Sequence, residues 1–188
     1  DRRSGEDPLT LLRRLNSDLY AEIAYAKEST SVDSPIEVAL NARQGVCQDL
    51  AHIMIALVRN MQIPCRYVSG YLHHNASHAD RSTDGATHAW VEALLPGLGW
   101  IGFDPTNNLI AGGRHIRTAI GRDYSDVPPT VGLMKGSAQT QLQVRVRVSP
   151  SEAVLPPEQE FASDEEWSRF LESDQEIERK HAQQQQQQ

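Results

Sequence analysis

Apolar residues recur at helical spacing near the start of the chain. Between residues 8 and 27 they stand three or four positions apart, at Leu9, Leu12, Leu15, Leu19 and Ile23. This spacing predicts an amphipathic helix that buries one face. The segment Ser34-Pro35-Ile36-Glu37 has a serine cap, a proline at the first helical position and a glutamate three residues after the cap. It predicts a short second helix that ends near Gly45.

The segment from Cys47 to Met61 is apolar on nearly every side. A helix that lacks a polar face is buried on all sides. We therefore expect this helix to run through the centre of the core, with Cys47 in its first turn.

Strand-like segments follow this helix. Three of them, rich in apolar residues, are at 65–72, 88–95 and 99–104. The turn Pro96-Gly97-Leu98-Gly99 predicts a hairpin between the second and the third. Residues 141–148 alternate apolar and polar side chains, which predicts a fourth strand with one buried and one wet face. One buried helix packed on an antiparallel sheet is an α+β architecture.

The part of the chain after Ser149 differs in composition from the rest. Residues 150–162 contain prolines and predict a linker, and Ser163-Asp164-Glu165-Glu166 begins an acidic amphipathic helix that we expect over 163–182. This helix is either a docking element for a partner or a cover for its own core. Six glutamines at 183–188 predict a disordered tail.

Charge limits the classes of partner. The net charge is -7, and residues 1–150 hold as many acidic as basic side chains, so the excess lies in the tail. A neutral body argues against nucleic-acid binding. No run approaches the ~20 apolar residues of a membrane span. Two cysteines in unlike contexts favour a reducing cytoplasm over a disulfide scaffold, and Asp1 in place of methionine predicts a fragment or processed chain.

A thiol, an imidazole and a carboxylate stand at the ends of predicted elements. Cys47 opens the buried helix just after Gly45, where unpaired amide donors and the helix dipole favour the thiolate. His88 opens one strand of the hairpin and Asp104 closes the other, so antiparallel pairing would bring them together. We interpret Cys47, His88 and Asp104 as the nucleophile, base and orienting carboxylate of a cysteine-dependent enzyme.

Structural interpretations of the same residues remain open. A lone cysteine more often packs in a core, a single histidine is usually structural, and Asp104-Pro105-Thr106-Asn107 also fits a simple turn. Cys65, which follows Pro64 at the start of a strand, has neither a glycine turn nor a helix start, and we interpret it as core packing.

The histidines invite comparison with a metal site. Four of them, His73, His74, His78 and His88, lie within 16 positions. They lack the spacing that fixes metal ligands on a rigid element, and a polar loop over 73–86 accounts for most of them. We therefore predict no metal and no other cofactor.

Four segments in order carry a resemblance to a known family: ARQGVCQDLAH, QIPCRYVSGYL, THAWVEALLPGLGWIGFDPTNN and GRDYSDVPP. They resemble the bacterial transglutaminase-like superfamily of candidate cysteine proteases over roughly residues 8–148. The resemblance implies a papain-like α+β catalytic core, which we place at 1–149, with Cys47, His88 and Asp104 as its triad. Animal crosslinking transglutaminases have tryptophan after the nucleophile, whereas this chain has Gln48. No acidic loop has calcium-binding spacing either. The resemblance therefore supports thiol acyl chemistry more than crosslinking.

We expect the Cys47 thiolate to attack an amide or peptide carbonyl, with water releasing the acid from a thioester. Amine-dependent acyl transfer is the alternative within enzymes, and a non-catalytic module that binds peptides or partners is the alternative outside them. The expected substrate is a peptide, a protein or a small amide. The residues that we predict to contact it are Gln48, Tyr67, Tyr71, Trp90, Asp123 and Tyr124, although packing explains the tyrosines and Asp123 equally well.

Overall fold

A computed structural model describes residues 7–74, 80–83, 85–129 and 146–149. The chain divides after Ser149 into two units, and every described residue belongs to the first. The predicted linker, acidic helix and glutamine tail therefore lie outside the described residues. In chain order the elements are α1 (Pro8–Glu22), β1 (Ala24–Tyr25), α2 (Ile36–Ala42), β2 (Gln44–Gly45), α3 (Cys47–Asn60), β3 (Cys65–Leu72), β4 (His88–Leu95), β5 (Gly99–Asp104), β6 (Leu109–Ile110), β7 (His115–Gly121) and the 3₁₀ turn η1 (Tyr124–Asp126).

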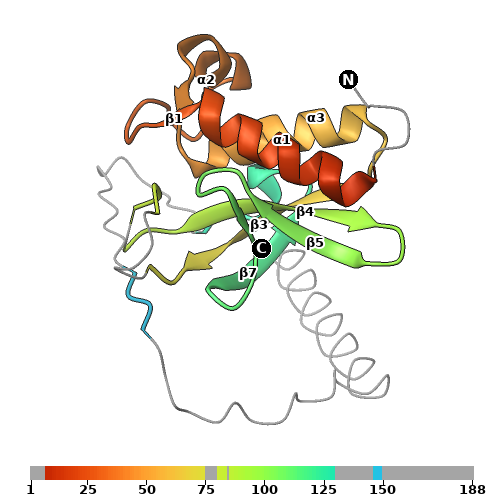
Figure 1. Cartoon of the computed structure of the whole chain (residues 1–188). Helices are drawn as coiled ribbons and strands as arrows, with labels where there is room; N and C mark the ends of the chain where they lie inside the picture. Colours follow the sequence, from red (N-terminus) through yellow and green to blue (C-terminus); the bar gives the residue numbers. More distant parts are fainter. Residues whose placement is uncertain (1–6, 75–79, 84, 130–145, 150–188) are drawn as a thin grey trace, which may run out of the picture. The chain divides into compact units, whose positions relative to one another are not determined.

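Helix α1 forms where the apolar spacing predicts it. The Asp7 side chain caps its start by accepting hydrogen bonds from the amides of Leu9 and Thr10. Leu12 and Leu19 on its apolar face are buried in the core. The capped, one-sided helix lies over α3 and the sheet (Figure 1).

Helix α2 begins one residue later than the capping pattern indicates, at Ile36. Ser34 does not cap it; the Ser34 hydroxyl instead accepts a hydrogen bond from the Ser31 amide in the preceding loop. The helix ends at Ala42, and the following residue, Arg43, has a left-handed φ of 50°. The two-residue strands β1 and β2 then pair in parallel just before α3, which fixes the direction in which the chain enters that helix.

Helix α3 packs one broad face against the sheet, where Leu50, Ala51, Met54 and Val58 are buried. The expectation that this helix is buried on all sides is wrong, because Leu57 remains 38% exposed. The neighbouring α1 and α2 stand apart at this point and leave an apolar groove of about 340 Å³. Helix propensity and one buried face suffice for α3, and the outer face is open.

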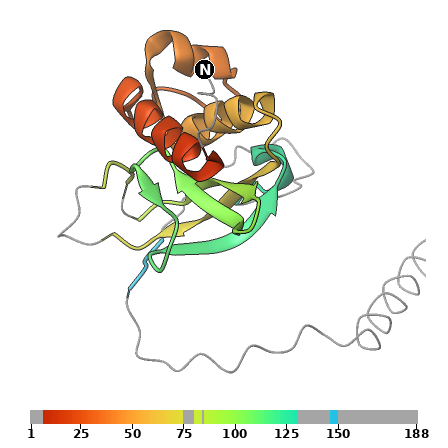
Figure 2. The same ribbon diagram turned by 45° about the vertical axis from the view of Figure 1, so that its right-hand side comes forward.

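The five-stranded sheet has the order β6-β5-β4-β3-β7, and all its pairs are antiparallel. The three helices lie on one face of it (Figures 1 and 2). Strands β4 and β5 form the predicted hairpin, which pairs Val91 with Phe103. The sequence prediction of an α+β fold, with the Cys47 helix on an antiparallel sheet, is confirmed.

The fourth strand predicted from the sequence is wrong over its described part. Residues 146–149 are not in a strand, and 141–145 lie outside the described residues. The edge beside β3 is taken by β7 instead. An edge strand buries little, and Ile116 and Ile120 on β7 stay exposed, so its sequence lacks the alternation by which buried strands are found.

Candidate active site

Cys47 is the first residue of α3, at the helix end where backbone amides are unpaired. The Asp49 carboxylate organises the turn before it by accepting hydrogen bonds from the Val46 amide at 2.8 Å and the Thr30 hydroxyl at 2.6 Å. A Cβ at Gly45 would come within 2.9 Å of this carboxylate. Glycine at position 45 thus leaves room for Asp49, which holds the turn that presents Cys47.

His88 and Asp104 meet where β4 begins and β5 ends. The Nε2 atom of His88 lies 2.8 Å from Oδ2 of Asp104, and the two residues are only 3% and 0% exposed. The second ring nitrogen of His88, Nδ1, receives no hydrogen bond from the described residues. The half-buried Cys47 side chain nevertheless lies close enough to His88 to influence its ionisation. The hairpin and the start of α3 therefore bring together the three residues predicted from the sequence.

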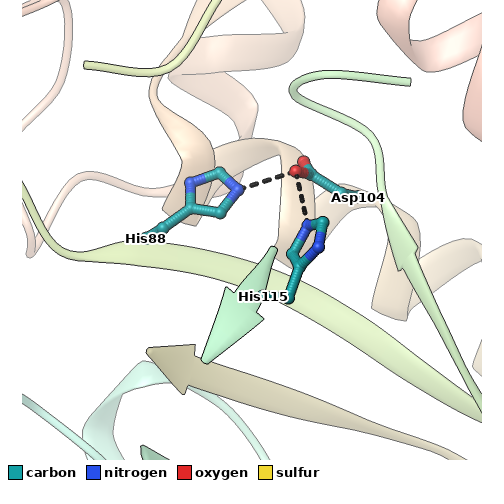
Figure 3. Close-up of side chains that lie close together, drawn as sticks. All are labelled: His88, Asp104 and His115. Atoms are coloured by element: carbon teal, nitrogen blue, oxygen red, sulfur yellow. Dashed lines mark hydrogen bonds and ion pairs between the residues drawn. The ribbon is translucent and has the colours of Figure 1, made fainter. Parts of the chain in front are cut away.

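Five N–H groups surround the Asp104 carboxylate. The Oδ1 atom accepts from the amides of Thr106 and Asn107, at 3.0 and 3.2 Å. The Oδ2 atom accepts from His88, from the Asn107 side chain at 2.8 Å and from His115 Nε2 at 3.2 Å. Figure 3 shows both imidazoles directed at this carboxylate. A fully buried carboxylate with this many donors is held ionised.

The ionisation of the pair follows from these contacts. Burial by itself lowers the pKa of His88, but the charge and the hydrogen bond of Asp104 outweigh it, so that the His88 pKa is raised. Burial likewise raises the pKa of Asp104, and the His88 charge together with the donors from His115 and Asn107 lowers it well below its usual range. The geometry thus favours an imidazolium paired with a carboxylate.

Sequence reasoning missed His115 and the side chain of Asn107. His115 opens β7, the strand that was not predicted, and nothing in its local sequence distinguishes it from a surface histidine. Asn107 lay in the segment that also fitted a simple turn, and no role was predicted for its side chain. Its side-chain oxygen accepts from the amides of Arg81 and Ser82, so it also ties the β3–β4 loop to Asp104.

His88, Asp104 and His115 are also the residue types that bind metals, and their ligand atoms lie within 4.8 Å of one another. The hydrogen bonds argue for a different use. His115 Nδ1 accepts from the Gly112 amide at 3.3 Å, which leaves its proton on Nε2, whereas a metal ligand needs an unprotonated nitrogen. In the arrangement described, the two histidines and Asp104 form a hydrogen-bonded cluster.

The residues predicted to contact substrate fall into two groups. Tyr67 and Trp90 are 2% and 1% exposed, and their rings contact other side chains: Tyr67 packs on His52 and Tyr124, and Trp90 on His88 and His115. Their burial supports the packing interpretation.

The other predicted residues are more accessible. The Gln48 amide donates to the Val32 carbonyl, and Asp123 caps η1 through the Ser125 amide. The Tyr124 amide donates to His52 on α3. Tyr71 lines a pocket of about 370 Å³ that also includes Thr87, the residue before His88.

Cys65 packs against the hydrophobic core, as the sequence predicts. Its thiol donates to the Ile55 carbonyl at 3.7 Å. Burial raises the pKa of this thiol. Cys65 is therefore an internal reference for the reactivity of Cys47.

Comparison with known sequences places this site in a family. Residues 2–105 match the sequence profile of the transglutaminase-like superfamily. The chain belongs to this superfamily. The matched segment includes Cys47, His88 and Asp104 and ends before His115.

Several relatives are similar over most of this chain. An uncharacterised protein of Mycobacterium tuberculosis is 38% identical over 149 residues, which are 76% of this chain and 48% of that protein. One from Mycobacterium leprae is 38% identical over 130 residues, 69% of this chain and 46% of that protein. A protein-glutamine gamma-glutamyltransferase of Pseudomonas aeruginosa is 31% identical over 99 residues, 51% of this chain and 15% of that protein. The chain spans about half the length of its mycobacterial relatives.

A solved structure supports the fold. A candidate cysteine protease from Cytophaga hutchinsonii is 32% identical, with a TM-score of 0.53 over 62% of this chain and 37% of that one. Within the part of the chain that the structure describes, no helix has the length and apolar character needed to cross a bilayer.

Proposed function

We propose that the protein carries out thiol-dependent acyl chemistry on amide or peptide bonds, with hydrolysis as the outcome. The observation that carries the proposal is the buried His88–Asp104 pair at 2.8 Å beside Cys47, the first residue of α3. Membership of the transglutaminase-like superfamily and similarity to a candidate cysteine protease support it. In this proposal, Cys47 is the nucleophile, His88 the acid–base group and Asp104 its orienting carboxylate.

The first half of the reaction forms a thioester. The Cys47 thiol gives its proton to Nδ1 of His88, the nitrogen that Asp104 leaves open, and the thiolate attacks the carbonyl carbon. Backbone amides in the first turn of α3 stabilise the oxyanion, at a typical ~3 kcal/mol per donor. The C–N bond then breaks as His88 protonates the leaving amine.

The second half releases the acyl group. Water attacks the thioester carbon while His88 accepts its proton. The C–S bond breaks, the acid departs, and the Cys47 thiolate faces the His88 imidazolium again. Asp104 keeps Nε2 of His88 protonated in both halves and stabilises the imidazolium.

Acyl transfer to an amine is the second candidate. The relative from Pseudomonas aeruginosa named as a protein-glutamine gamma-glutamyltransferase favours it. In that case a primary amine replaces water in the second half. Because water is far more abundant, transfer requires a site that concentrates the amine.

The substrate class in this proposal is a peptide, a protein or a small amide. Tyr71 and Thr87 line a pocket of about 370 Å³, and Thr87 directly precedes His88 in the chain. We assign this pocket to the substrate. Both cysteines are free, which fits a reducing compartment such as the cytoplasm.

To test the proposal, a diverse peptide pool is incubated with the protein, with and without a primary amine, and is then analysed by mass spectrometry. We expect backbone cuts or a gain of about one dalton from amide hydrolysis. An amine adduct would instead indicate the transferase. Cys47→Ala is the inactive variant, and Cys65→Ala is the matched control that should retain turnover. Turnover that survives Cys47→Ala contradicts the proposal, and no change in any sample would favour the non-catalytic binding module.

A further inference from the structure

His115 contacts the Asp104 carboxylate beside His88, and Figure 3 shows both rings directed at the same oxygen. Its Nε2 atom lies 3.2 Å from Oδ2 of Asp104, the same oxygen that His88 contacts. The His115 side chain is only 3% exposed. His115 is therefore a buried side chain that contacts the Asp104 carboxylate directly.

The hydrogen bonds of His115 determine where its proton lies. The Gly112 amide donates to Nδ1 at 3.3 Å, so Nδ1 is an acceptor. Since a neutral imidazole carries one proton, that proton is on Nε2 and is donated to Asp104. A protonated His115 would place an N–H group against the Gly112 N–H group. The arrangement thus selects a neutral imidazole.

The two arginines that flank His115 in the chain form ion pairs with other residues. On the same segment, Arg114 pairs with Asp80 at 2.7 Å and Arg117 pairs with Glu92 at 3.1 Å. From the hairpin, Asp104 is the charged group that His115 contacts, with the His88 ring 6.2 Å away.

Packing fixes the orientation of the ring as well. The indole of Trp90 on β4 meets the His115 ring edge-on at 5.1 Å and also lies beside the His88 ring at 6.1 Å. Aromatic contacts of this geometry contribute about 0.5–1.5 kcal/mol beyond burial. Trp90 therefore holds both imidazoles in place relative to the carboxylate.

We propose that His115 is a positioning residue: a neutral donor that orients the Asp104 carboxylate toward His88 and leaves its negative charge for the His88 imidazolium. A cation at position 115 would neutralise the carboxylate, and an apolar residue would leave Oδ2 short of one donor. The proposal rests on the proposed function only in that His88 and Asp104 assist Cys47.

The tautomer of His115 is testable in the intact protein by nitrogen-detected NMR of the histidine side chains. We expect the His115 signals at pH 7 to show a proton on Nε2 and an unprotonated Nδ1. The His115→Gln spectrum assigns the signals by their loss. A proton on Nδ1 would overturn the proposal.

A matched pair of variants tests the positioning role. His115→Gln keeps a neutral N–H donor at similar reach, whereas His115→Leu removes it. The readout is the pH dependence of Cys47 alkylation by iodoacetamide, which needs no substrate. We expect the Leu variant to lose at least about tenfold in rate at pH 7, with its profile displaced to higher pH, and the Gln variant to stay within about threefold of the parent chain.

Equal behaviour of the two variants would reduce His115 to a structural residue and reject the proposal. If His115→Leu fails to fold, the NMR measurement on the unaltered chain still decides the question. Failure of the proposed function has a different signature, because it would appear as turnover that survives Cys47→Ala while the His115 signals and the alkylation profiles keep the predicted form.

Discussion

Asn107 is the residue on which the hydrogen bonds around Asp104 converge. Its side-chain amide donates to Asp104 at 2.8 Å and to Ser82 at 3.0 Å, and its oxygen accepts from two backbone amides. The Asn107 side chain therefore donates hydrogen bonds through its nitrogen and accepts them through its oxygen. An aspartate of the same shape could only accept.

Asn107→Asp changes this donor into an acceptor without changing the shape of the side chain. Two buried carboxylates would then face each other, so we expect a loss of about 2–4 kcal/mol in the free energy of unfolding at pH 7. Urea denaturation measures it. Asn108→Asp is the matched control, because exposed Asn108 uses only its oxygen, which accepts from Asn16. Equal losses in both variants would contradict this account of Asn107.

The principal site residues were predictable because each stands at the end of an element. Hairpin pairing places His88, which opens one strand, beside Asp104, which closes the other, and Cys47 opens the helix before them. The donors to the carboxylate were not predictable in this way. His115 reaches Asp104 from a strand whose partner, β3, is more than forty residues away in the chain, and no local pattern encodes that distance.

At the scale of elements, the sheet is shaped around the indole of Trp90. A Cβ on Gly70 of β3 would lie 2.7 Å from the Trp90 ring and would also collide with the Ile116 carbonyl of β7. A Cβ on Gly102 of β5 would lie in ordinary contact with the other end of the same ring, 3.5 Å from its Nε1, but would collide with the Ala111 side chain. Gly70 therefore leaves room for the ring, which in turn supports the histidines.

Gly70→Ala is expected to destabilise the fold by about 1–3 kcal/mol, because backbone and ring must move to admit the methyl group. It should also slow Cys47 alkylation, since Trp90 contacts both His88 and His115. Thermal unfolding and alkylation rates measure the two effects. Gly113→Ala is the control, because an added Cβ there has no neighbour within 4 Å. A Gly70→Ala protein as stable as this control would refute the packing argument.

The elements with strong burial patterns were predicted well and the weak ones were not. Helices α1 and α3 and strands β3 to β5 follow from apolar periodicity, since each buries a continuous face. Strand β7 escaped prediction because it lies at the sheet edge with most of its side chains exposed. The open face of α3 was not predicted either. Its apolar residues Ala56 and Leu57 suggested burial, but α1 and α2 do not cover them.

At the scale of the whole molecule, the buried ion pair makes stability depend on pH in both directions. The lowered pKa of Asp104 contributes stability that is present above the unfolded value of about 3.9 and is lost as pH falls through the folded value. The raised pKa of His88 contributes stability that is complete below about 6.5 and is lost as pH rises toward the folded value.

We therefore expect the contribution of the pair to be greatest between about pH 4 and pH 6.5, and Asp104→Asn to flatten the profile on both sides. Urea denaturation from pH 3 to pH 9 measures it. Asp18→Asn is the control, because that carboxylate is exposed on α1. A profile in which Asp104→Asn keeps the shape of the parent protein would show that the pair is not ionised as described.

The most direct test of the account compares Cys47 alkylation by iodoacetamide in the parent chain and in His88→Gln, followed by peptide mass spectrometry from pH 5 to pH 10. Cys65, whose thiol pKa burial raises, serves as the internal reference. We predict that Cys47 reacts at least about tenfold faster than Cys65 at pH 7, and that His88→Gln lowers the Cys47 rate at pH 7 by about tenfold or more. Identical Cys47 profiles in the two proteins would contradict the claim that His88 activates Cys47.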